Sequence, residues 1–453
     1  MARQLFGTDG VRGVAGEFLT ADLAVALARA AVTQSTAERP QVLIVRDTRE
    51  SGEMLEAAIA AGVTAAGGDA LLGGVLPTPA APMLVRRHGL QLAAVISASH
   101  NPYRDNGIKI FGADGFKLSD DTEHEIEAEL DRPPRQPERI GRVRRLHGAL
   151  EDYLRELHVR FQGLEISGRR LLLDCANGAT YRAAPEIFRR LGAEVDVLAS
   201  EPDGRNINHE CGSTHVEALA NRAASGDYDV AFAFDGDGDR VLAVDREGVV
   251  VDGDELVALA ALHLRDRGSL AGGGVAVTVM TNYGFHAAMK AAGIEVATTP
   301  VGDRYVLDEL RRRGWSLGGE QSGHIIELGF GPSGDGIASA LLVLEALGDR
   351  DLSRRDAMAK LPQRLVNIRA ADRAALTVAM EQQAVREAID REGVALSGRG
   401  RVLVRASGTE PLIRVMVEAP SESETDAVCA RLTEIVETAI AERPRESVSP
   451  RNR

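Results

Sequence analysis

The sequence predicts an α/β protein built from three similar α/β domains and a smaller C-terminal α+β domain. The main observation is a unit of strand, polar loop, helix, glycine and strand that occurs three times, starting at residues 42–45, 171–173 and 275–279. Its strands are continuous apolar runs, which are typical of a parallel sheet covered by helices on both faces, and the glycines are typical of helix C-termini. Ligands of such domains bind at loops beyond the carboxyl ends of the strands, so the polar loops are candidate sites.

The last part of the chain has a different pattern. Residues 364–368, 401–404 and 413–417 alternate between apolar and polar side chains, as half-exposed strands do, and helical stretches are expected at 380–389 and 425–441. This pattern predicts an α+β domain with an antiparallel sheet. The Pro-, Ser- and Arg-rich tail at 443–453 is expected to be disordered. We place the four domains at residues 1–150, 151–252, 253–364 and 365–453.

Composition limits the class of protein. The chain has 453 residues with 26% charged and 44% hydrophobic side chains, as in ordinary globular proteins. Its net charge of -14 argues against a partner that is nucleic acid or an anionic membrane. The three cysteines, Cys175, Cys211 and Cys429, are too far apart for a disulfide framework or a zinc site. With no secretion segment and no long apolar run in sight, we expect a soluble cytoplasmic protein.

The most informative segment is the loop at residues 235–240. Asp235, Asp237 and Asp239 alternate with Gly236 and Gly238, so in an extended loop the three carboxylates can project to one side. The glycines let the backbone curve tightly, and three like charges this close repel one another unless a cation lies between them. The loop therefore predicts a site for a hard divalent cation, either Mg²⁺ or Ca²⁺.

Two alternatives for this loop can be weighed from the sequence. A helical calcium-binding hand needs Gly at its sixth position and Glu at its twelfth, where this chain has Arg240 and Arg246. A solvated acidic turn is the simpler alternative, but apolar runs at 230–234 and 241–244 predict buried strands on both sides of the loop. The metal site is the preferred interpretation.

A second candidate loop, residues 96–102, follows the apolar run at 92–95. Its small residues are expected to leave the hydroxyl of Ser99 exposed at a tight turn, where a base or a metal could activate it as a nucleophile. A protease-like pair of Ser99 and His100 is not expected, because neighbours on extended backbone point to opposite faces. Lys109, in the next strand, could reach back to the turn. A turn held by local hydrogen bonds and a solvated lysine remain the alternatives.

Three further loops carry polar groups with a chemical use. Glu320, Ser322 and His324 alternate, which suits sugar hydroxyls and acid–base work, although a single histidine is more often structural. The glycine-rich loop at 6–13 presents Arg12 to an anion, unless it is only a flexible terminus. The loop at 405–411 offers a guanidinium, hydroxyls and glycine N–H groups that suit a phosphate, with an ordinary hairpin turn as the alternative. Its candidate residues are Arg405, Ser407, Gly408, Thr409 and, close by, Arg414.

These five segments together resemble the α-D-phosphohexomutase superfamily, in the expected order and over essentially the whole chain. The similarity is greatest to the members that act on glucosamine phosphates, and it is carried by residues 6–13, 206–208, 211–214, 301–306 and 320–324. Val45 departs from the pattern, since relatives often carry Gly there. The resemblance implies three related α/β domains and a fourth α+β domain around one central cleft. It also suggests a homodimer.

The resemblance implies an isomerase that interconverts glucosamine 6-phosphate and glucosamine 1-phosphate, for UDP-N-acetylglucosamine biosynthesis. Ser99 would be a phosphoserine, and a sugar 1,6-bisphosphate would be both intermediate and activator. One Mg²⁺ per chain would be held by the Ser99 phosphate and the three aspartates, a neutralisation that the charge of phosphoserine requires. The roles carried over are charge compensation by Arg12, Lys109 and Arg240, proton transfer by Lys109, His100 and His324, and sugar or phosphate binding by Gly302, Asp303, Arg304, Glu320, Ser322, Arg405, Ser407, Gly408, Thr409 and Arg414.

Other functions remain to be separated from this one. A phosphoglucomutase or phosphomannomutase is the nearest, and Gln321 beside Glu320 favours the amino sugar over it. A two-zinc serine phosphatase would need several His/Asp ligand clusters, which the sequence lacks. A non-catalytic phosphosugar-binding protein would have little use for Ser99, three metal carboxylates and Lys109 together.

Overall fold

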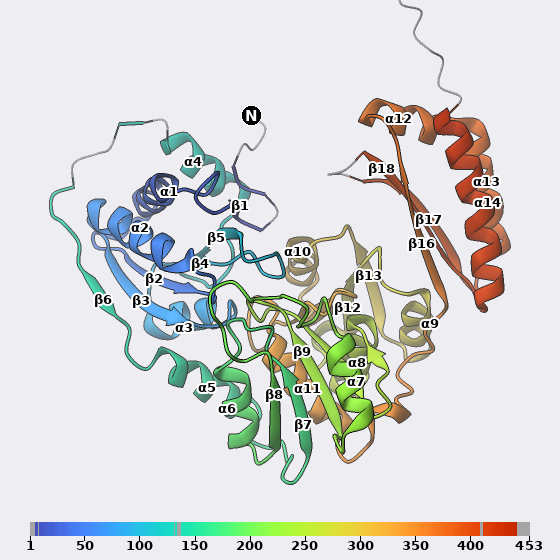
Figure 1. The fold of residues 1–453 in the computed structure, drawn as a ribbon, viewed down its shortest axis with the longest axis horizontal. Coiled ribbons are helices and arrows are strands. Elements are labelled where there is room, and N and C mark those ends of the chain that lie inside the picture. The colour runs from blue at the N-terminus through green and yellow to red at the C-terminus, as the bar shows by residue number, and fades with distance from the viewer. Residues whose placement is uncertain (1–4, 8, 131, 134–136, 408–410, 442–453) are drawn as a thin grey trace, which may run out of the picture. The chain divides into compact units, whose positions relative to one another are not determined.

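The computed structural model describes residues 5–7, 9–130, 132–133, 137–407 and 411–441. The chain divides into two compact units, Met1–Thr281 with Ala292–Ala357 and Asn282–Ala291 with Met358–Arg453 (Figure 1). The first unit contains three β-sheets and the second contains one. The tail expected to be disordered at 443–453 lies outside the described residues.

The first sheet has six strands in the order β1-β5-β4-β2-β3-β6. Strands β4, β2, β3 and β6 are parallel, as predicted, whereas β5 runs antiparallel to both β4 and β1. The antiparallel pairing follows from the short connection between β4 and β5, which is too brief for a crossover helix. The strands are β1 (Val11–Val14), β2 (Gln41–Arg46), β3 (Asp69–Val75), β4 (Leu92–Ile96), β5 (Asp105–Gly112) and β6 (Val143–Arg145).

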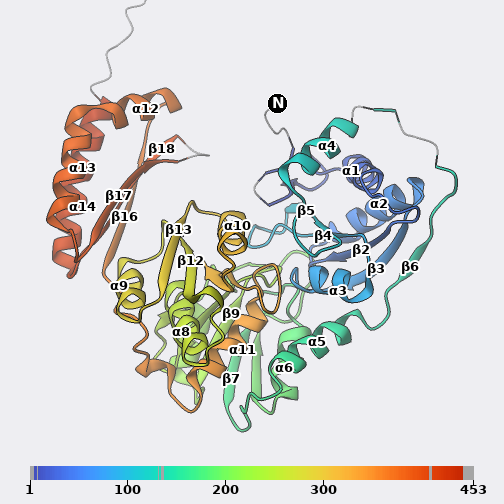
Figure 2. The same cartoon turned by 180° about the vertical axis from the view of Figure 1, so that it is seen from behind.

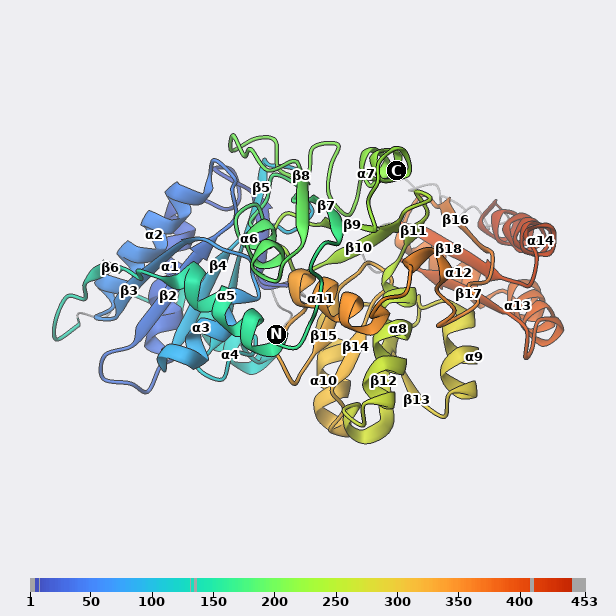
Figure 3. The ribbon, with the colours of Figure 1, turned by 90° about the horizontal axis from the view of Figure 1, so that it is seen from below.

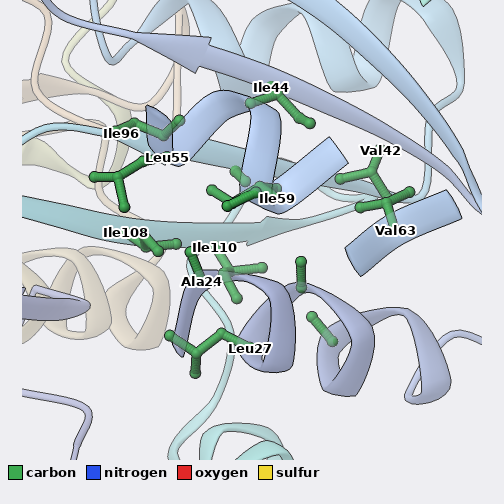
Figure 4. Packing of buried hydrophobic residues seen from close by; sticks show 14 of the residues in the cluster. Ala24, Leu27, Val42, Ile44, Leu55, Ile59, Val63, Ile96, Ile108 and Ile110 are labelled. Carbon is green, nitrogen blue, oxygen red and sulfur yellow. The ribbon is translucent and has the colours of Figure 1, made fainter. Parts of the chain in front are cut away.

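Helices cover both faces of this sheet, with α1 and α2 on one side and α3 on the other (Figure 2). The apolar side chains of α2 follow the helical period at Leu55, Ile59 and Val63, and they pack on Ile44 and Ile110 of the sheet (Figure 4). The buried cluster fixes the strand ends from which the serine loop (residues 96–102) emerges. The helices are α1 (Ala21–Thr33), α2 (Gly52–Ala65), α3 (Ala80–His88) and α4 (Asp120–Leu130).

The second sheet has the order β11-β10-β9-β7-β8. Ala231 and Ala233 of β9 join the cluster under α7, while Phe232 stacks on Phe188 of α6, so the two helices lie on opposite faces (Figure 3). Strands β9 and β10 form an antiparallel pair joined by the aspartate loop (residues 235–240). The elements are α5 (Ala149–Arg160), β7 (Arg170–Asp174), α6 (Ala183–Arg190), β8 (Glu194–Leu198), α7 (Glu217–Ser225), β9 (Val230–Phe234), β10 (Val241–Asp245) and β11 (Val250–Val251).

The third sheet has the order β13-β12-β14-β15, with the first three strands parallel. The antiparallel strand β15 follows β14 directly, so residues 320–324 form the loop at that edge. The elements are α8 (Gly253–Asp266), β12 (Gly274–Thr278), β13 (Glu295–Thr299), α10 (Asp303–Arg313), β14 (Leu317–Gly319), β15 (Ile325–Glu327) and α11 (Gly336–Leu347), with short 3₁₀ turns at Ala271–Gly273 and Leu352–Arg354.

The second unit contains the antiparallel sheet β16-β18-β17, as predicted. The single helix expected at 380–389 is wrong, because two helices meet at Gln382. That residue has extended backbone (φ -61°, ψ 133°), and its Nε2 donates a 2.8 Å hydrogen bond to the carbonyl of Ala439. The elements are α9 (Tyr283–Ala291), β16 (Gln363–Arg369), α12 (Arg373–Glu381), α13 (Gln383–Ala395), β17 (Arg401–Ala406), β18 (Leu412–Glu418) and α14 (Glu422–Ala441).

The predicted glycine stops are confirmed in all three repeats. Gly67, Gly192 and Gly293 have φ values of 90°, 97° and 70°, a left-handed conformation that only glycine adopts at no steric cost. Among the described residues, no helix has both the length and the apolar composition needed to span a lipid bilayer.

Candidate active site

The aspartate loop lies between β9 and β10, and its three carboxylates are buried. Asp235, Asp237 and Asp239 each present an oxygen within 4.8 Å of the other two. Asp237 Oδ1 and Asp239 Oδ1 are buried and make no hydrogen bond within the described part of the chain. Buried carboxylate oxygens that lack a donor are costly unless a cation binds them. The donor set therefore fits a hard divalent ion such as Mg²⁺.

The glycines of this loop are required by close packing. A Cβ on Gly236 would lie 2.5 Å from the main-chain oxygen of Ser99, a distance that no side chain tolerates. Gly238 has φ 74°, in the left-handed region. The glycine at 236 thus lets the serine loop and the aspartate loop touch backbone to backbone, although 136 residues separate Ser99 from Asp235.

Ser99 follows β4 and points at the aspartates. Its Oγ donates a hydrogen bond of 2.6 Å to Asp235 Oδ2. The expectation of an exposed hydroxyl is wrong, because Ser99 is only 2% exposed. Ser99 also has φ 53°, rare for a residue with a side chain, so the chain is not extended here. This is why His100 Nδ1 lies 3.3 Å from Ser99 Oγ, contrary to the expectation that neighbouring side chains point apart.

A buried arginine holds the serine loop in this conformation. Arg49 donates hydrogen bonds to the carbonyls of Ser99 (2.9 Å), Asn101 (2.9 Å), Asp105 (3.0 Å) and Pro102. Its Nε lies 2.8 Å from Asp47 Oδ2, an oxygen that also accepts from Ser97 Oγ. Strained backbone persists only where its surroundings determine it this fully.

Arg49 and Asp47 were not predicted as site residues. The sequence feature that could have indicated them is the polar turn at residues 46–49, which directly follows a buried strand. Asn208 was also missed as a positioning residue, although its segment was noted. Its Nδ2 donates to the main-chain oxygens of Ser99 (2.9 Å) and Asn101 (3.1 Å).

Lys109 extends from β5 to the aspartates and is 1% exposed, so the solvated lysine is ruled out. Its Nζ lies 2.9 Å from Asp237 Oδ2, 3.0 Å from Asp9 Oδ2 and 3.6 Å from Asp239 Oδ2. Burial alone would lower its pKa, but the carboxylates of Asp237, Asp9 and Asp239 outweigh that effect and raise the pKa well above its usual value. Lys109 is therefore an ammonium ion at neutral pH. Thr78 Oγ1 donates to the same Asp237 oxygen at 2.6 Å.

The aspartates differ in their electrostatic surroundings. Burial, followed by the charges of Asp239 and Asp237, raises the pKa of Asp235 well above its usual range. Burial acts the same way on Asp239, but Lys109 and His324 overcome it and lower the pKa of that carboxyl. A cation bound among the three carboxylates would favour the ionised form of each.

The pKa values of the two histidines of the site are shifted in opposite directions. Burial, with the charges of Arg240 and Arg12, lowers the pKa of His100 to about 4, so its imidazole is neutral at neutral pH. Burial also disfavours charge on His324, but Asp239, Asp303 and Glu320 raise its pKa to about 9. The Gly334 N–H donates to His324 Nε2 at 3.1 Å, which only a neutral ring accepts. At neutral pH the raised pKa of His324 favours the protonated ring, which loses this hydrogen bond and places a positive charge 3.8 Å from Asp303 Oδ2.

The residues expected to bind sugar line the neighbouring loops. Glu320 is 8% exposed, and its Oε1 accepts a 3.1 Å hydrogen bond from the Gly302 N–H. The Oγ of Ser322 is buried with no partner in the described ranges. Arg304 pairs with Glu123 at 3.1 Å and with Asp120, so its guanidinium is committed to α4 in this conformation.

The arginines expected near the transferred phosphate also have carboxylate neighbours. Arg12 pairs with Asp9 through Nη2. The main-chain N–H of Arg240 donates a 3.1 Å hydrogen bond to Asp235 Oδ1, and the guanidinium Nε of Arg240 lies 3.8 Å from Asp239 Oδ1. The guanidinium groups of Arg12 and Arg240 therefore lie among carboxylates. An incoming phosphate would compete with these carboxylates for both guanidinium groups.

The phosphate-binding candidates of the last domain lie in the second unit. Arg405 of β17 and Arg414 of β18 are direct partners in the antiparallel register, which places two guanidinium groups side by side. Burial and the charge of Arg414 lower the pKa of Arg405. Ser407 follows in the loop and is 8% exposed. Gly408 and Thr409 lie outside the described residues.

Comparison with known proteins agrees with this arrangement. Models of the four phosphoglucomutase/phosphomannomutase domains match residues 3–136 (α/β/α domain I), 151–248 (domain II), 252–365 (domain III) and 365–435 (C-terminal domain). The phosphoglucosamine mutase of Moorella thermoacetica is 49% identical over 443 residues, which cover 95% of this chain and 99% of that protein. That of Pelotomaculum thermopropionicum is 47% identical over 446 residues, covering 95% and 98%.

Solved structures share the fold at lower identity. A phosphoglucomutase/phosphomannomutase family protein from Burkholderia thailandensis has a TM-score of 0.81 at 23% identity, covering 95% of this chain and 97% of that chain. The N-acetylphosphoglucosamine mutase of Aspergillus fumigatus, solved with GlcNAc-6P and magnesium, has a TM-score of 0.68 at 20% identity and covers 96% of each chain. With all four domains matched and full-length relatives at nearly half identity, the chain belongs to the phosphoglucomutase/phosphomannomutase family and, within it, to the phosphoglucosamine mutases.

Proposed function

We propose that this protein interconverts glucosamine 6-phosphate and glucosamine 1-phosphate, with Ser99 as the carrier of the phosphoryl group. The substrate class comes from the names of the relatives. The observation that most directly supports Ser99 is its 2.6 Å contact with Asp235, which sets a hydroxyl against a cluster of carboxylates suited to a divalent ion. A phosphorylated serine there would need such an ion to offset the repulsion.

We propose Mg²⁺, one per chain, as that ion. Asp235, Asp237, Asp239 and an oxygen of phosphorylated Ser99 would hold it. When bound, it would neutralise charge on the transferring phosphoryl group and polarise that group for attack. The two buried oxygens of Asp237 and Asp239 that lack a donor support this assignment.

The reaction would proceed in two transfers of the same kind. A hydroxyl of the sugar phosphate attacks the phosphorus of phosphorylated Ser99, so a sugar O–P bond forms and the P–Oγ bond breaks. The hydroxyl proton passes to a base, and Ser99 Oγ takes up a proton. The product is glucosamine 1,6-bisphosphate, which turns around and returns its other phosphate to Ser99. The same bisphosphate would activate enzyme that has lost its phosphate.

The protonation states of the site divide the proton-transfer roles. His100, neutral and 3.3 Å from Ser99 Oγ, is suited to accept a proton there. Lys109 stays charged, so it would stabilise the transferring phosphoryl group or donate a proton and would not serve as a base. The imidazole of His324 can be neutral or protonated, so His324 would exchange a proton with the sugar hydroxyl.

The remaining residues would bind substrate. Arg12 and Arg240 would offset the charge of the transferring phosphate. Sugar contacts are assigned to Glu320, Ser322, Gly302, Asp303 and Arg304, and contacts to the phosphate that is not transferred are assigned to Arg405, Ser407, Gly408, Thr409 and Arg414. The domain limits at 1–150, 151–252, 253–364 and 365–453, the homodimer and the cytoplasmic location stay predictions.

Intact-protein and peptide mass spectrometry before and after incubation with a sugar 1,6-bisphosphate tests the proposal. We expect one phosphate per chain on the peptide that contains Ser99. Turnover of glucosamine, glucose and mannose phosphates is compared in parallel, with glucosamine phosphate expected to be converted fastest. Phosphate on another residue would refute the nucleophile. Faster turnover of glucose or mannose phosphate would refute the substrate, and phosphate release without isomerisation would indicate a phosphatase.

A further inference from the structure

Lys117 belongs to none of the five segments discussed above, yet it lies at the centre of a network of charges. It follows β5 and pairs with Phe111 in an isolated antiparallel bridge. Its Nζ lies 2.5 Å from Asp9 Oδ1 and 2.5 Å from Asp303 Oδ2, and its side chain is 14% exposed. Asp303 is the first residue of α10, so Lys117 joins the first sheet to the third.

The two carboxylates held by Lys117 each contact a proposed proton-transfer residue. Asp9 Oδ2 is 3.0 Å from Lys109 Nζ, and Asp303 Oδ2 is 3.8 Å from His324 Nε2. Lys109 and His324 in turn contact the aspartate loop, at Asp237 (2.9 Å) and Asp239 (3.6 Å). Charges of alternating sign thus run in sequence through Lys109, Asp9, Lys117 and Asp303, and Asp303 in turn lies beside His324.

The sign of each charge explains why Lys117 matters to its neighbours. Asp9 and Asp303 both bind this ammonium group, and their negative charges repel each other. Burial raises the pKa of Asp303, and Lys117 is the largest influence that lowers it again. Without the lysine, two poorly solvated carboxylates would face each other, and at least one would turn away. Lys109 or His324 would then lose a contact that orients it.

We propose that Lys117 is a positioning residue of the mutase reaction, which holds Asp9 and Asp303 so that Lys109 and His324 stay oriented towards the aspartate loop. The inference rests on the proposed function. Lys117 need not touch the reacting atoms. A second link between the same parts of the fold, from Arg304 to Glu123 at 3.1 Å, remains when Lys117 is replaced. Loss of Lys117 should therefore impair orientation while leaving the fold intact.

The test compares Lys117→Met and Lys117→Arg with Lys290→Met, a control on an exposed lysine of α9. For Lys117→Met we expect kcat to fall at least tenfold, with KM changed less than threefold, in a variant that is folded and still unfolds cooperatively. Lys117→Arg keeps the positive charge and should recover a large part of kcat. Lys290→Met should leave both constants unchanged.

A double-mutant cycle separates positioning from a general loss of charge. If Lys117 acts through Asp303, then Lys117→Met combined with Asp303→Asn should lower kcat no further than the more damaging single change. The inference is overturned if the fold-loss in kcat of the double variant equals the product of the two single fold-losses. It is also overturned if the kcat of Lys117→Met is within twofold of that of the unmodified protein. Should Lys117→Met not fold, the cycle is run with Lys117→Gln, which also removes the charge, and is judged by the same criterion.

The outcomes keep this inference apart from the proposed function. An unmodified protein with no mutase activity refutes the function itself. An active unmodified protein with fully active Lys117 variants refutes only the positioning role.

Discussion

The hydrogen bonds from Arg49 to the serine loop allow the loss in free energy of unfolding to be predicted for variants of this residue. Arg49 is fully buried and donates to four main-chain carbonyls while pairing with Asp47. A hydrogen bond from a charged donor contributes about 1.5–3 kcal/mol, and breaking a buried ion pair by removing one partner costs about 3–5 kcal/mol. These terms overlap and do not add. We therefore expect Arg49→Met to lower the free energy of unfolding by about 3–5 kcal/mol.

Arg49→Lys distinguishes charge from geometry. A lysine keeps the positive charge beside Asp47, but its single ammonium group cannot reach four carbonyls at once. We expect this variant to lose about 3 kcal/mol and to acquire phosphate on Ser99 more slowly, because the φ of 53° at Ser99 is no longer enforced. Urea unfolding followed by circular dichroism gives the stability, and intact mass during incubation with sugar bisphosphate gives the rate.

A matched control is Arg190→Lys, on a surface arginine that pairs with Glu151 at 2.8 Å. Surface pairs of this kind contribute less than about 1 kcal/mol, so its stability and labelling rate should stay near those of the unmodified protein. If Arg49→Met is as stable as this control, Arg49 does not stabilise the fold as described. If Arg49→Met is destabilised but phosphorylated at the normal rate, Arg49 does not hold Ser99 for phosphorylation.

Three further predictions concern the metal loop, the nucleophile and a buried carboxyl. Ser99→Ala should reduce turnover to the assay background while costing only about 1 kcal/mol of stability, since one hydrogen bond to Asp235 is lost. Asp237→Asn should raise the Mg²⁺ concentration for half-maximal activity at least tenfold, and chelation of the metal should abolish turnover of the unmodified protein. Asp335, the N-cap of α11, has a pKa raised by burial to about 6. The folded state therefore binds this proton more tightly than the unfolded chain does, so the contribution of Asp335 to stability is greatest below about pH 4 and is lost, by about 3 kcal/mol, as the pH rises through 6. Asp335→Asn should remove that dependence in urea unfolding at several pH values.

Each of these has an outcome that contradicts it. Near-normal turnover of Ser99→Ala would exclude the nucleophile, and an unchanged Mg²⁺ requirement in Asp237→Asn would exclude the metal loop. Identical pH profiles for Asp335→Asn and the unmodified protein would show that another group carries the dependence.

The sequence alone determined the features that depend on short spacing. The aspartate loop was predictable because its three carboxylates alternate with glycines in five consecutive residues between two apolar strands. The glycine stops and the antiparallel sheet of the second unit were predictable for the same reason, since helix ends and strand alternation are local patterns. The single helix expected at 380–389 failed because an extended residue at 382, with its side chain bonded to α14, interrupts it.

Only the tertiary structure decided how distant groups meet. No local pattern relates Ser99 to Asp235, Arg49 to the carbonyls of the serine loop, or Lys117 to Asp9 and Asp303. The left-handed backbone at Ser99, which turns His100 towards the hydroxyl, depends on contacts made by residues remote in the chain. Local sequence limits the conformations open to a few neighbouring residues, whereas the choice among them, and the charge state of each buried group, follows from which side chains the folded sheets bring together.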